Sequence, residues 1–155
     1  MTVESVVKLA VAKAALNPSP IYPKWILEGN PVARNKVLSS SADGTASTLI
    51  WYCTAGRFNW FYDIDETIYV LEGGMVIKDH AGGVRRLAAG DTIFFPAGSS
   101  AEWHVEDYVR KVAFCRAPLP GALVFWKRGI RFLKRRLMGN AKGGASAAPA
   151  MFQSN

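Results

Sequence analysis

Residues 66–98, ETIYVLEGGMVIKDHAGGVRRLAAGDTIFFPAG, decide the fold of this chain. Short runs of β-branched and aromatic residues alternate there with turn dipeptides, and the same pattern extends over residues 48–116. Turn signals recur about every eight to twelve residues without a helical spacer, which is typical of antiparallel strands in a sandwich or small barrel. Residues 79–83 are the clearest hairpin loop, and residues 90–91 and 96–98 mark two further turns.

The segments on either side differ in composition. Apolar side chains recur at helical spacing over residues 3–16, which predicts a short amphipathic helix. An irregular arm rich in Pro, Asn and Ser follows it, so we assign helix and arm together to residues 1–47 and the barrel core to residues 48–117. Residues 118–140 are predicted to form a basic amphipathic helix, and residues 141–155 a disordered tail.

The chain has 155 residues, half of them hydrophobic, which suits one globular domain with a core. Acidic and basic side chains balance over residues 1–126, so the net charge of +7 comes entirely from the residues that follow. The basic character therefore belongs to the C-terminal segment. Because the rest of the chain offers no basic face and no RNA-binding motif, we do not expect nucleic acid as a partner.

Cysteine usage and the N-terminus bear on the compartment. Cys53 and Cys115 lack CxxC spacing and lie in apolar, strand-like contexts. We expect two buried free thiols in a cytoplasmic protein, with a disulfide between them as the alternative. Glu4, Lys8 and Lys13 do not fit the pattern of a cleaved export signal.

Two glycine-anchored motifs carry a family resemblance. They are Glu66-TIYVLE-Gly73 and Gly90-DTIFF-Pro96-Ala97-Gly98, and they are accompanied by Trp51-Tyr-Cys-Thr-Ala-Gly56 and by Val109-Arg110-Lys111 after Trp103. This combination resembles the cupin superfamily, and within it the small cupins similar to (S)-ureidoglycine aminohydrolase. The resemblance implies an all-β jelly-roll barrel, here with short N-terminal and C-terminal α-helices, a pocket at the barrel mouth and a homodimer.

The resemblance also implies that a metal is held, in most relatives, by two histidines, the motif glutamate and a third histidine. Counting back from Glu66, the two histidine positions fall on Asn59 and Phe61, or on Trp60 and Tyr62 with the alternative spacing. The position of the third histidine falls on Ala101. One carboxylate offers too few donors for a divalent transition metal, so we predict no metal and no cofactor.

The chain has two histidines, and neither is predicted to replace these ligands. His80 lies in the predicted hairpin loop, where a solvated side chain is expected. His104 faces away from the pocket if Trp103 faces into it, because side chains alternate along a strand. A bulge that turns His104 inward is the alternative.

The predicted pocket follows from strand parity and from alignment to the motifs. If Glu66 points inward, Ile68 does so too, and the lining set is Asn59, Phe61, Glu66, Ile68, Ala101 and Trp103. An apolar, aromatic cavity with one carboxylate and one amide suits a small organic ligand. The alternative for Phe61 and Trp103 is plain core packing.

Glu66 is the candidate acid or base of this pocket, because a carboxyl group is the proton-transfer group that the predicted lining offers. The alternative is a structural carboxylate tied to Arg57, to Lys78 or to a backbone donor. Asp63 and Asp65 are expected on the connecting loop.

The sequence therefore predicts a small-molecule-binding cupin without the usual metal site, acting either as a binding protein or as a metal-independent enzyme. The resemblance raises ureides and related nitrogenous substrates. The alternative is a membrane-peripheral or partner-docking module that uses the C-terminal helix on an anionic surface, with the barrel as scaffold. Its cations are Lys127, Arg128, Arg131, Lys134, Arg135 and Arg136.

Overall fold

The computed structural model describes Lys8 and residues 10–118. The strands are β1 (Asn17–Pro18), β2 (Ile26–Glu28), β3 (Ala33–Ser40), β4 (Ala46–Phe61), β5 (Asp65–Asp79), β6 (Val84–Ala88), β7 (Thr92–Phe95) and β8 (Ser100–Arg116). Two 3₁₀ turns, η1 (Val11–Lys13) and η2 (Pro23–Trp25), precede and follow β1. All strand pairs are antiparallel, which confirms the predicted all-β class.

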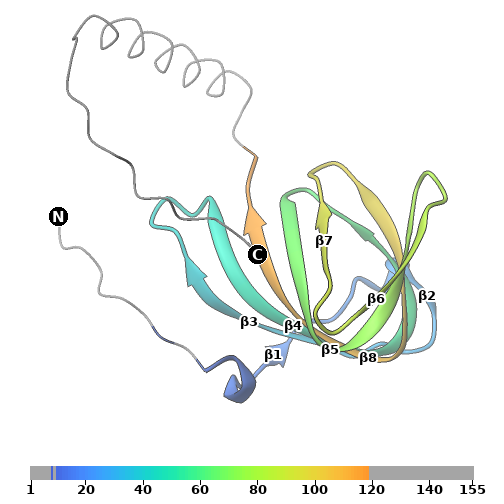
Figure 1. The fold of residues 1–155 in the computed structure, drawn as a ribbon, viewed down its shortest axis with the longest axis horizontal. Coiled ribbons are helices and arrows are strands. Elements are labelled where there is room, and N and C mark those ends of the chain that lie inside the picture. Colours follow the sequence, from blue (N-terminus) through green and yellow to red (C-terminus); the bar gives the residue numbers. More distant parts are fainter. Residues whose placement is uncertain (1–7, 9, 119–155) are drawn as a thin grey trace, which may run out of the picture. The chain divides into compact units, whose positions relative to one another are not determined.

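The strands form one curved sheet around a single hydrophobic core (Figure 1). Their order is β1-β3-β4-β8-β5-β6, while β2 pairs with β4 and β7 pairs with β5. The three long strands β4, β5 and β8 lie side by side in the middle of the sheet and curl over the core. Their inward side chains therefore supply most of the interior.

The predicted turns at residues 79–83, 90–91 and 96–98 are confirmed. Asp79 Oδ1 accepts hydrogen bonds from the N–H groups of Ala81 and Gly83, at 3.0 and 2.8 Å, and so closes the β5–β6 hairpin. The other two turns are closed by backbone hydrogen bonds at residues 88–91 and 96–99. Aspartate marks turns in sequence because its side chain accepts hydrogen bonds from nearby backbone N–H groups, and glycine marks them because it adopts positive φ, as Gly82, Gly90 and Gly98 do here.

The pair Gly73–Gly74 lies within β5 and does not form a turn. Gly73 has φ +69°, and a Cβ there would lie 2.0 Å from the carbonyl oxygen of Tyr108. The register between β5 and β8 shifts between Gly73 and Val76. Glycine is thus required for a bulge that keeps two long strands in contact.

The predicted N-terminal helix is wrong over the described part of residues 3–16. Only the single turn η1 forms there, and residues 17–18 already belong to β1. A short segment with prolines at 18 and 20 cannot propagate a helix whose isolated form is marginal. The remaining residues of that prediction, 1–7 and 9, lie outside the described residues, as do the predicted C-terminal helix and tail from residue 119 onward.

The irregular arm predicted before residue 48 is also wrong over residues 33–40. These residues form β3, which pairs with β4 from Ala33↔Cys53 to Ser40↔Ser47. Ala33 and Ile21 are buried in the core.

Among the residues that the structure describes, no helix has the length and apolar character to cross a membrane.

A bulge between β4 and β8, with its extra residue on β8, changes which side chains of β4 face inward. Cys53 pairs with Val109 and Gly56 with Val105, so three steps along β4 match four along β8. A Cβ on Gly56 would lie 2.9 Å from the Pro31 ring, so glycine permits this close approach. Because side chains alternate along a strand, the odd-numbered positions face inward before the bulge and the even-numbered positions after it.

Candidate functional site

A cavity of about 110 Å³ lies on the inner side of the sheet. We call it the inner cavity. Residues from β3, β4, β5 and β8 and from the segment after β1 line it: Ser19, Asn35, Leu49, Trp51, Trp60, Glu66, Trp103 and Lys111. Three indole rings thus surround one carboxylate, one ammonium and two uncharged polar groups.

The charged groups of the inner cavity form a buried ion pair. Lys111 Nζ donates a hydrogen bond to Glu66 Oε1 at 2.5 Å. The two residues are only 5% and 8% exposed, respectively. Lys111 Nζ also lies 5.2 Å from the ring centroid of Trp51 and 4.9 Å from that of Trp103. The carboxylate and the ring faces together offset part of the cost of removing the ammonium from water.

The aromatic rings are fixed by their contacts with one another. Trp51 packs edge-on against Trp60 and Trp103, with ring centroids 5.8 Å apart in both pairs. Trp103 Nε1 donates a hydrogen bond to the hydroxyl oxygen of Tyr62 at 3.0 Å. Burial, and next the nearby Glu66 carboxylate, raise the pKa of Tyr62 well above its ordinary value. Tyr62 is therefore a neutral structural group under the cavity wall.

The polar side of the cavity comes from the N-terminal strands. Asn35 lies on β3, and its Nδ2 donates a hydrogen bond to Ser19 Oγ at 3.1 Å. Both side chains line the inner cavity. The region predicted to be an arm thus contributes one wall of the site.

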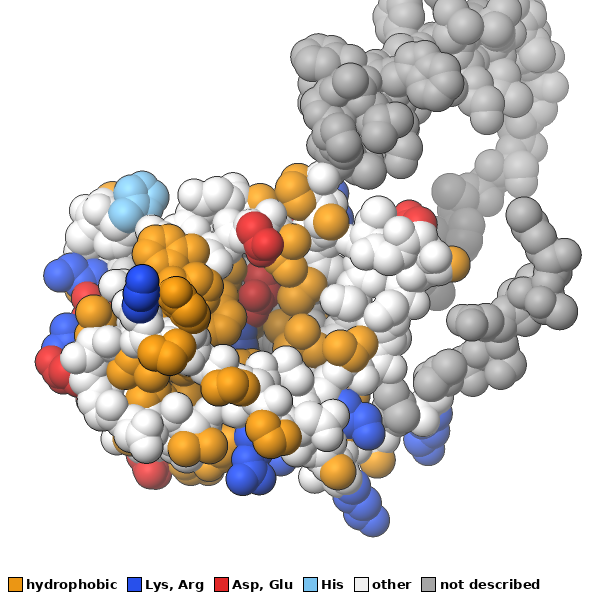
Figure 2. All heavy atoms as spheres, turned by 180° about the vertical axis from the view of Figure 1, so that it is seen from behind, with side chains coloured by type: hydrophobic (Ala, Val, Ile, Leu, Met, Phe, Trp, Pro, Cys, Tyr) orange, Lys and Arg blue, Asp and Glu red, His pale blue; other side chains and the backbone are white. Residues whose placement is uncertain are grey.

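A larger hollow of about 870 Å³ adjoins the inner cavity, with Leu49, Trp60 and Glu66 in the walls of both. We call it the outer hollow. Figure 2 shows the hollowed face, where acidic side chains lie between hydrophobic walls. Trp25 of η2 packs against Trp60 and Phe61, with ring centroids 5.5 and 5.3 Å away. The ion pair therefore lies at the inner end of an aromatic-walled hollow.

Two predicted pocket residues, Glu66 and Trp103, line the inner cavity. Ile68 and Ala101 point inward as expected, but they are buried in the core and are absent from the cavity wall.

Asn59 and Phe61 are not brought to the inner cavity, and this corrects the predicted lining. The bulge at Ala55 turns Trp60 and Tyr62 inward instead, which agrees with the alternative spacing of the motif. Phe61 is 52% exposed and contributes to the outer hollow.

Sequence reasoning missed Lys111, the other member of the ion pair. A signal was present, because Lys111 shares its strand parity with Val109 and Ala113, which are both apolar and buried. Glu66 does not use the predicted partners Arg57 and Lys78. The Arg57 guanidinium pairs instead with Glu28 and Glu102, while Lys78 is exposed.

The remaining titratable candidates lie away from the site or are unreactive. His80 and His104 are both exposed, and His104 pairs with Arg57 and Val76 on the outer face. Cys53 and Cys115 are buried and free. Burial raises the pKa of the Cys53 thiol to about 12 and that of Cys115 to about 11.

The residues of the inner cavity do not fit the metal that the cupin resemblance implies. Glu66 Oε1 already faces an ammonium at 2.5 Å, and the histidine positions of the motif hold the rings of Trp60 and Tyr62. Among the described residues, no three His, Cys, Asp or Glu side chains are grouped to hold an ion. The positive charge of the Lys111 ammonium would also repel a divalent cation bound beside it.

Comparison with known proteins agrees with the fold and the motifs. The profile of the EutQ-like cupin domain matches residues 40–113. This chain belongs to the cupin superfamily. No curated protein sequence matches it.

Three solved cupin structures show the range of similarity. Ethanolamine utilization protein Q of Salmonella typhimurium is 27% identical over 55% of this cupin and 69% of that chain, with a TM-score of 0.50. EutQ of Clostridium difficile is 25% identical over 56% and 63%, with a TM-score of 0.50. A Pseudomonas syringae protein of unknown function is 27% identical with a TM-score of 0.62, and the match covers 66% of this cupin but only 45% of that chain.

Proposed function

We propose that this cupin binds a small, uncharged polar molecule in the inner cavity, with a ureide or an amide as the chemical class. The observation that carries the proposal is the Glu66–Lys111 pair, whose two members line the cavity instead of being sealed within the core. A ureide or amide has N–H groups that a carboxylate accepts and a carbonyl oxygen that an ammonium can donate to. One such molecule satisfies both members of the pair.

Charge balance favours an uncharged ligand. The carboxylate of Glu66 and the ammonium of Lys111 cancel within 2.5 Å, so the cavity has no net charge for an ion to neutralise. An anion would gain attraction from Lys111 but meet repulsion from Glu66, and a cation would meet the reverse. Burying an unpaired charge is costly, whereas a neutral donor–acceptor molecule avoids that cost.

Cavity size limits the part of the ligand that enters. A volume of about 110 Å³ corresponds to roughly four water molecules at about 30 Å³ each. A urea-sized group of about four non-hydrogen atoms therefore fits. With at most about 1.5 kcal/mol per atom, such a fragment alone binds no tighter than about 40 μM.

The resemblance of the motifs to the ureidoglycine aminohydrolase-like cupins supports the same chemical class.

The pair also supports the role of Glu66 as an acid or base in a metal-independent reaction. A carboxylate can take a proton from a water molecule that adds to the carbonyl carbon, and can pass that proton to the nitrogen that leaves as ammonia when the C–N bond breaks. An ammonium on the carbonyl oxygen stabilises the charge that develops there. Ammonia release from the probes below, measured on the full chain and on Glu66→Gln, tests this role. Release by the wild-type chain that Glu66→Gln retains in full would refute it.

Tryptophan fluorescence tests binding, because Trp51, Trp60 and Trp103 line the cavity. We expect urea and acetamide, used at millimolar concentrations, to change the emission saturably, and acetate and methylammonium to bind at least tenfold more weakly. Lys111→Met is expected to abolish binding. The control is Lys78→Met, because Lys78 is an exposed lysine on β5.

Saturation-transfer NMR on the wild-type chain gives an independent reading that needs no variant. Absence of transfer to both urea and acetamide would disprove the proposal, as would equal affinity in Lys111→Met and Lys78→Met. Circular dichroism of each variant establishes that it is folded before its affinity is compared.

A further inference from the structure

We infer that the natural ligand carries a planar apolar tail without a negative charge, and that this tail lies in the outer hollow while the polar head lies in the inner cavity. This inference rests on the proposed function and adds the part of the ligand that the inner cavity is too small to hold.

The two spaces share walls at the position where head and tail would join. Leu49, Trp60 and Glu66 line both of them. When the polar head of a ligand contacts Glu66 and Lys111, the rest of the ligand therefore extends past these shared side chains into the outer hollow. The outer hollow is about eight times larger, at about 870 Å³ against about 110 Å³, so it accommodates the bulkier part.

The walls of the outer hollow select an apolar, planar group. Its lining includes Trp25, Phe61, Tyr62 and Ile64 beside the shared residues. Trp25 and Phe61 meet at an interplanar angle of 57°, so their rings present differently oriented faces and edges to an incoming group. Aromatic groups gain from offset and edge-on contacts of this kind in addition to the area that they bury.

The charges of the outer hollow exclude an anionic tail. The charged side chains among its described lining residues are the carboxylates Asp63 and Glu66, and the lining includes no Lys, Arg or His. Glu66 is balanced by Lys111, but Asp63 is exposed at the opening. A carboxylate or phosphate on the tail would meet repulsion without a basic partner.

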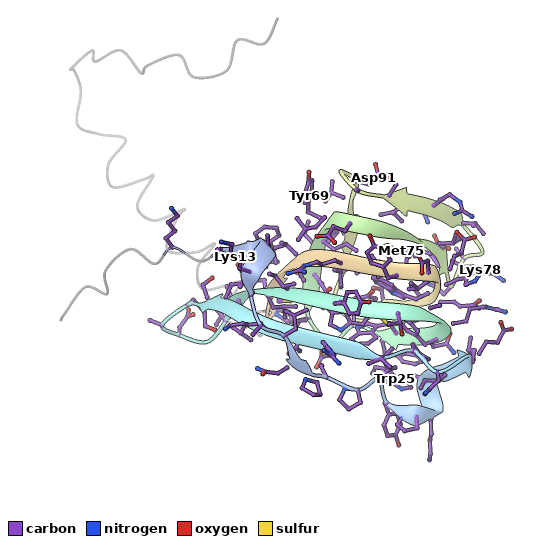
Figure 3. The ribbon with its side chains drawn as sticks, turned by 90° about the horizontal axis from the view of Figure 1, so that it is seen from below. Lys13, Trp25, Tyr69, Met75, Lys78 and Asp91 are labelled. Carbon is purple, nitrogen blue, oxygen red and sulfur yellow. The ribbon has the colours of Figure 1, made fainter. Side chains whose placement is uncertain are left out.

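Trp25 is a wall residue that belongs to the outer hollow alone. It lies at the end of η2, and its backbone N–H donates to the carbonyl oxygen of Tyr22 at 2.8 Å. The adjoining Ile26 pairs with Phe58 of β4, which anchors the turn to the sheet. Figure 3 shows Trp25 on the side of the molecule opposite Tyr69 and Asp91. Because Trp25 does not line the inner cavity, its removal separates recognition of the tail from recognition of the head.

The test compares methylurea, phenylurea and 4-ureidobenzoate by isothermal titration with the full chain. We expect phenylurea to bind at least tenfold more tightly than methylurea, because the ring buries apolar area in the outer hollow. We expect 4-ureidobenzoate, which adds a carboxylate to the same ring, to bind at least tenfold more weakly than phenylurea.

Variants locate the tail. Trp25→Ala is expected to weaken phenylurea at least fivefold and to leave methylurea within twofold. Phe61→Ala is a second variant, chosen because Phe61 is 52% exposed and its truncation is compatible with folding. Phe94→Ala is the matched control, because Phe94 is an exposed aromatic residue that lines a different hollow.

The outcomes separate the two proposals. If methylurea binds in a manner that depends on Lys111 but phenylurea binds no tighter, or if neither Trp25→Ala nor Phe61→Ala selectively weakens phenylurea, the tail assignment is overturned and the proposed function stands. If neither urea binds the wild-type chain, both proposals are overturned.

Discussion

Glu66 and Lys111 are joined by a hydrogen bond of 2.5 Å although they do not face each other across the sheet. In the register of β5 and β8, Glu66 is opposite Cys115 and Lys111 is opposite Val70. The lysine side chain must therefore extend along the inner face, past the inward position of Ala113. A small residue at 113 leaves room for the lysine stem, so the ion pair depends on a residue that carries no charge.

Ala113→Leu is predicted to displace the ammonium. The added methylene groups overpack a fully buried position, which typically costs about 1–3 kcal/mol in free energy of unfolding. We also expect the folded molecules of this variant to lose urea binding. A loss of stability alone would lower the number of folded molecules without changing their affinity for urea. Fluorescence titration checks this, with Ala88→Leu as the control because Ala88 is exposed. Unchanged urea affinity in folded Ala113→Leu would contradict the prediction.

Lys111→Met is predicted to destabilise the protein more than a substitution that removes an exposed charged side chain. It leaves the Glu66 carboxylate buried without a partner, and breaking a buried pair in this way costs about 3–5 kcal/mol. The double variant Glu66→Leu/Lys111→Met removes both charges and is expected to recover most of that loss. Guanidinium denaturation measures the free energy of unfolding. A double variant as unstable as the single one would show that packing, and not charge, is responsible.

The sequence predicted the fold through features that are local. Turn residues and short runs of β-branched and aromatic residues depend on neighbours within a few positions, and β5, β7 and β8 lie within the predicted strand region, residues 48–116. Residues 33–40 were missed because ARNKVLSS is polar, and its strand state depends on pairing with β4. Pairing between distant segments leaves little trace in a segment's own composition.

The candidate site was predicted only in part for the same reason. Glu66 and Trp103 follow from the motifs and line the inner cavity. Asn59 and Phe61 were assigned by counting back from Glu66 with one of two motif spacings, whereas Trp60 and Tyr62, the residues of the other spacing, face inward. Lys111 was overlooked because a lysine is ordinarily a surface residue, and its burial depends on Glu66 from another strand.

Gly73→Ala is predicted to be strongly destabilising. The substitution must adopt φ near +69° and would bring a Cβ to 2.0 Å from the Tyr108 carbonyl oxygen. We expect a loss of about 3 kcal/mol or more in free energy of unfolding, since the backbones of β5 and β8 must separate. Gly82→Ala is the control, because it has φ +85° but open space around it, and should cost only about 1 kcal/mol. Similar losses in the two variants, measured by thermal unfolding, would contradict the bulge argument.

The thiols of Cys53 and Cys115 are predicted to be unreactive in the folded protein. Burial raises their pKa values to about 12 and about 11, so only about one thiol in a thousand or fewer is ionised at pH 8. Ellman's reagent is therefore expected to modify neither cysteine within minutes under native conditions and both in concentrated guanidinium chloride. Rapid native modification would indicate that the core opens readily.

The loop between β3 and β4 is predicted to lose a stabilising contribution in acid. Asp43 accepts hydrogen bonds from Ser41 Oγ, the Thr45 N–H and Thr45 Oγ1, and these lower its pKa from 3.8 to about 2. A lowered folded-state pKa means that the contribution is full above pH 4 and disappears as the pH falls to about 2. Asp43→Ala should therefore have a lower Tm than wild type at pH 6, and the two Tm values should converge near pH 2. A difference that does not change over this range would contradict the assignment.

The bulge at Ala55 also governs how relatives of this protein can be compared. Deleting one residue between Cys53 and Phe58 would leave four steps between these two inward residues, so plain alternation along β4 would itself point Phe58, Trp60 and Tyr62 into the interior. A homologue one residue shorter there would thus keep the same inward side chains without the bulge. An alignment that places the gap elsewhere would exchange the inward and outward positions of this strand, so gap placement decides which side chains are compared as chamber residues.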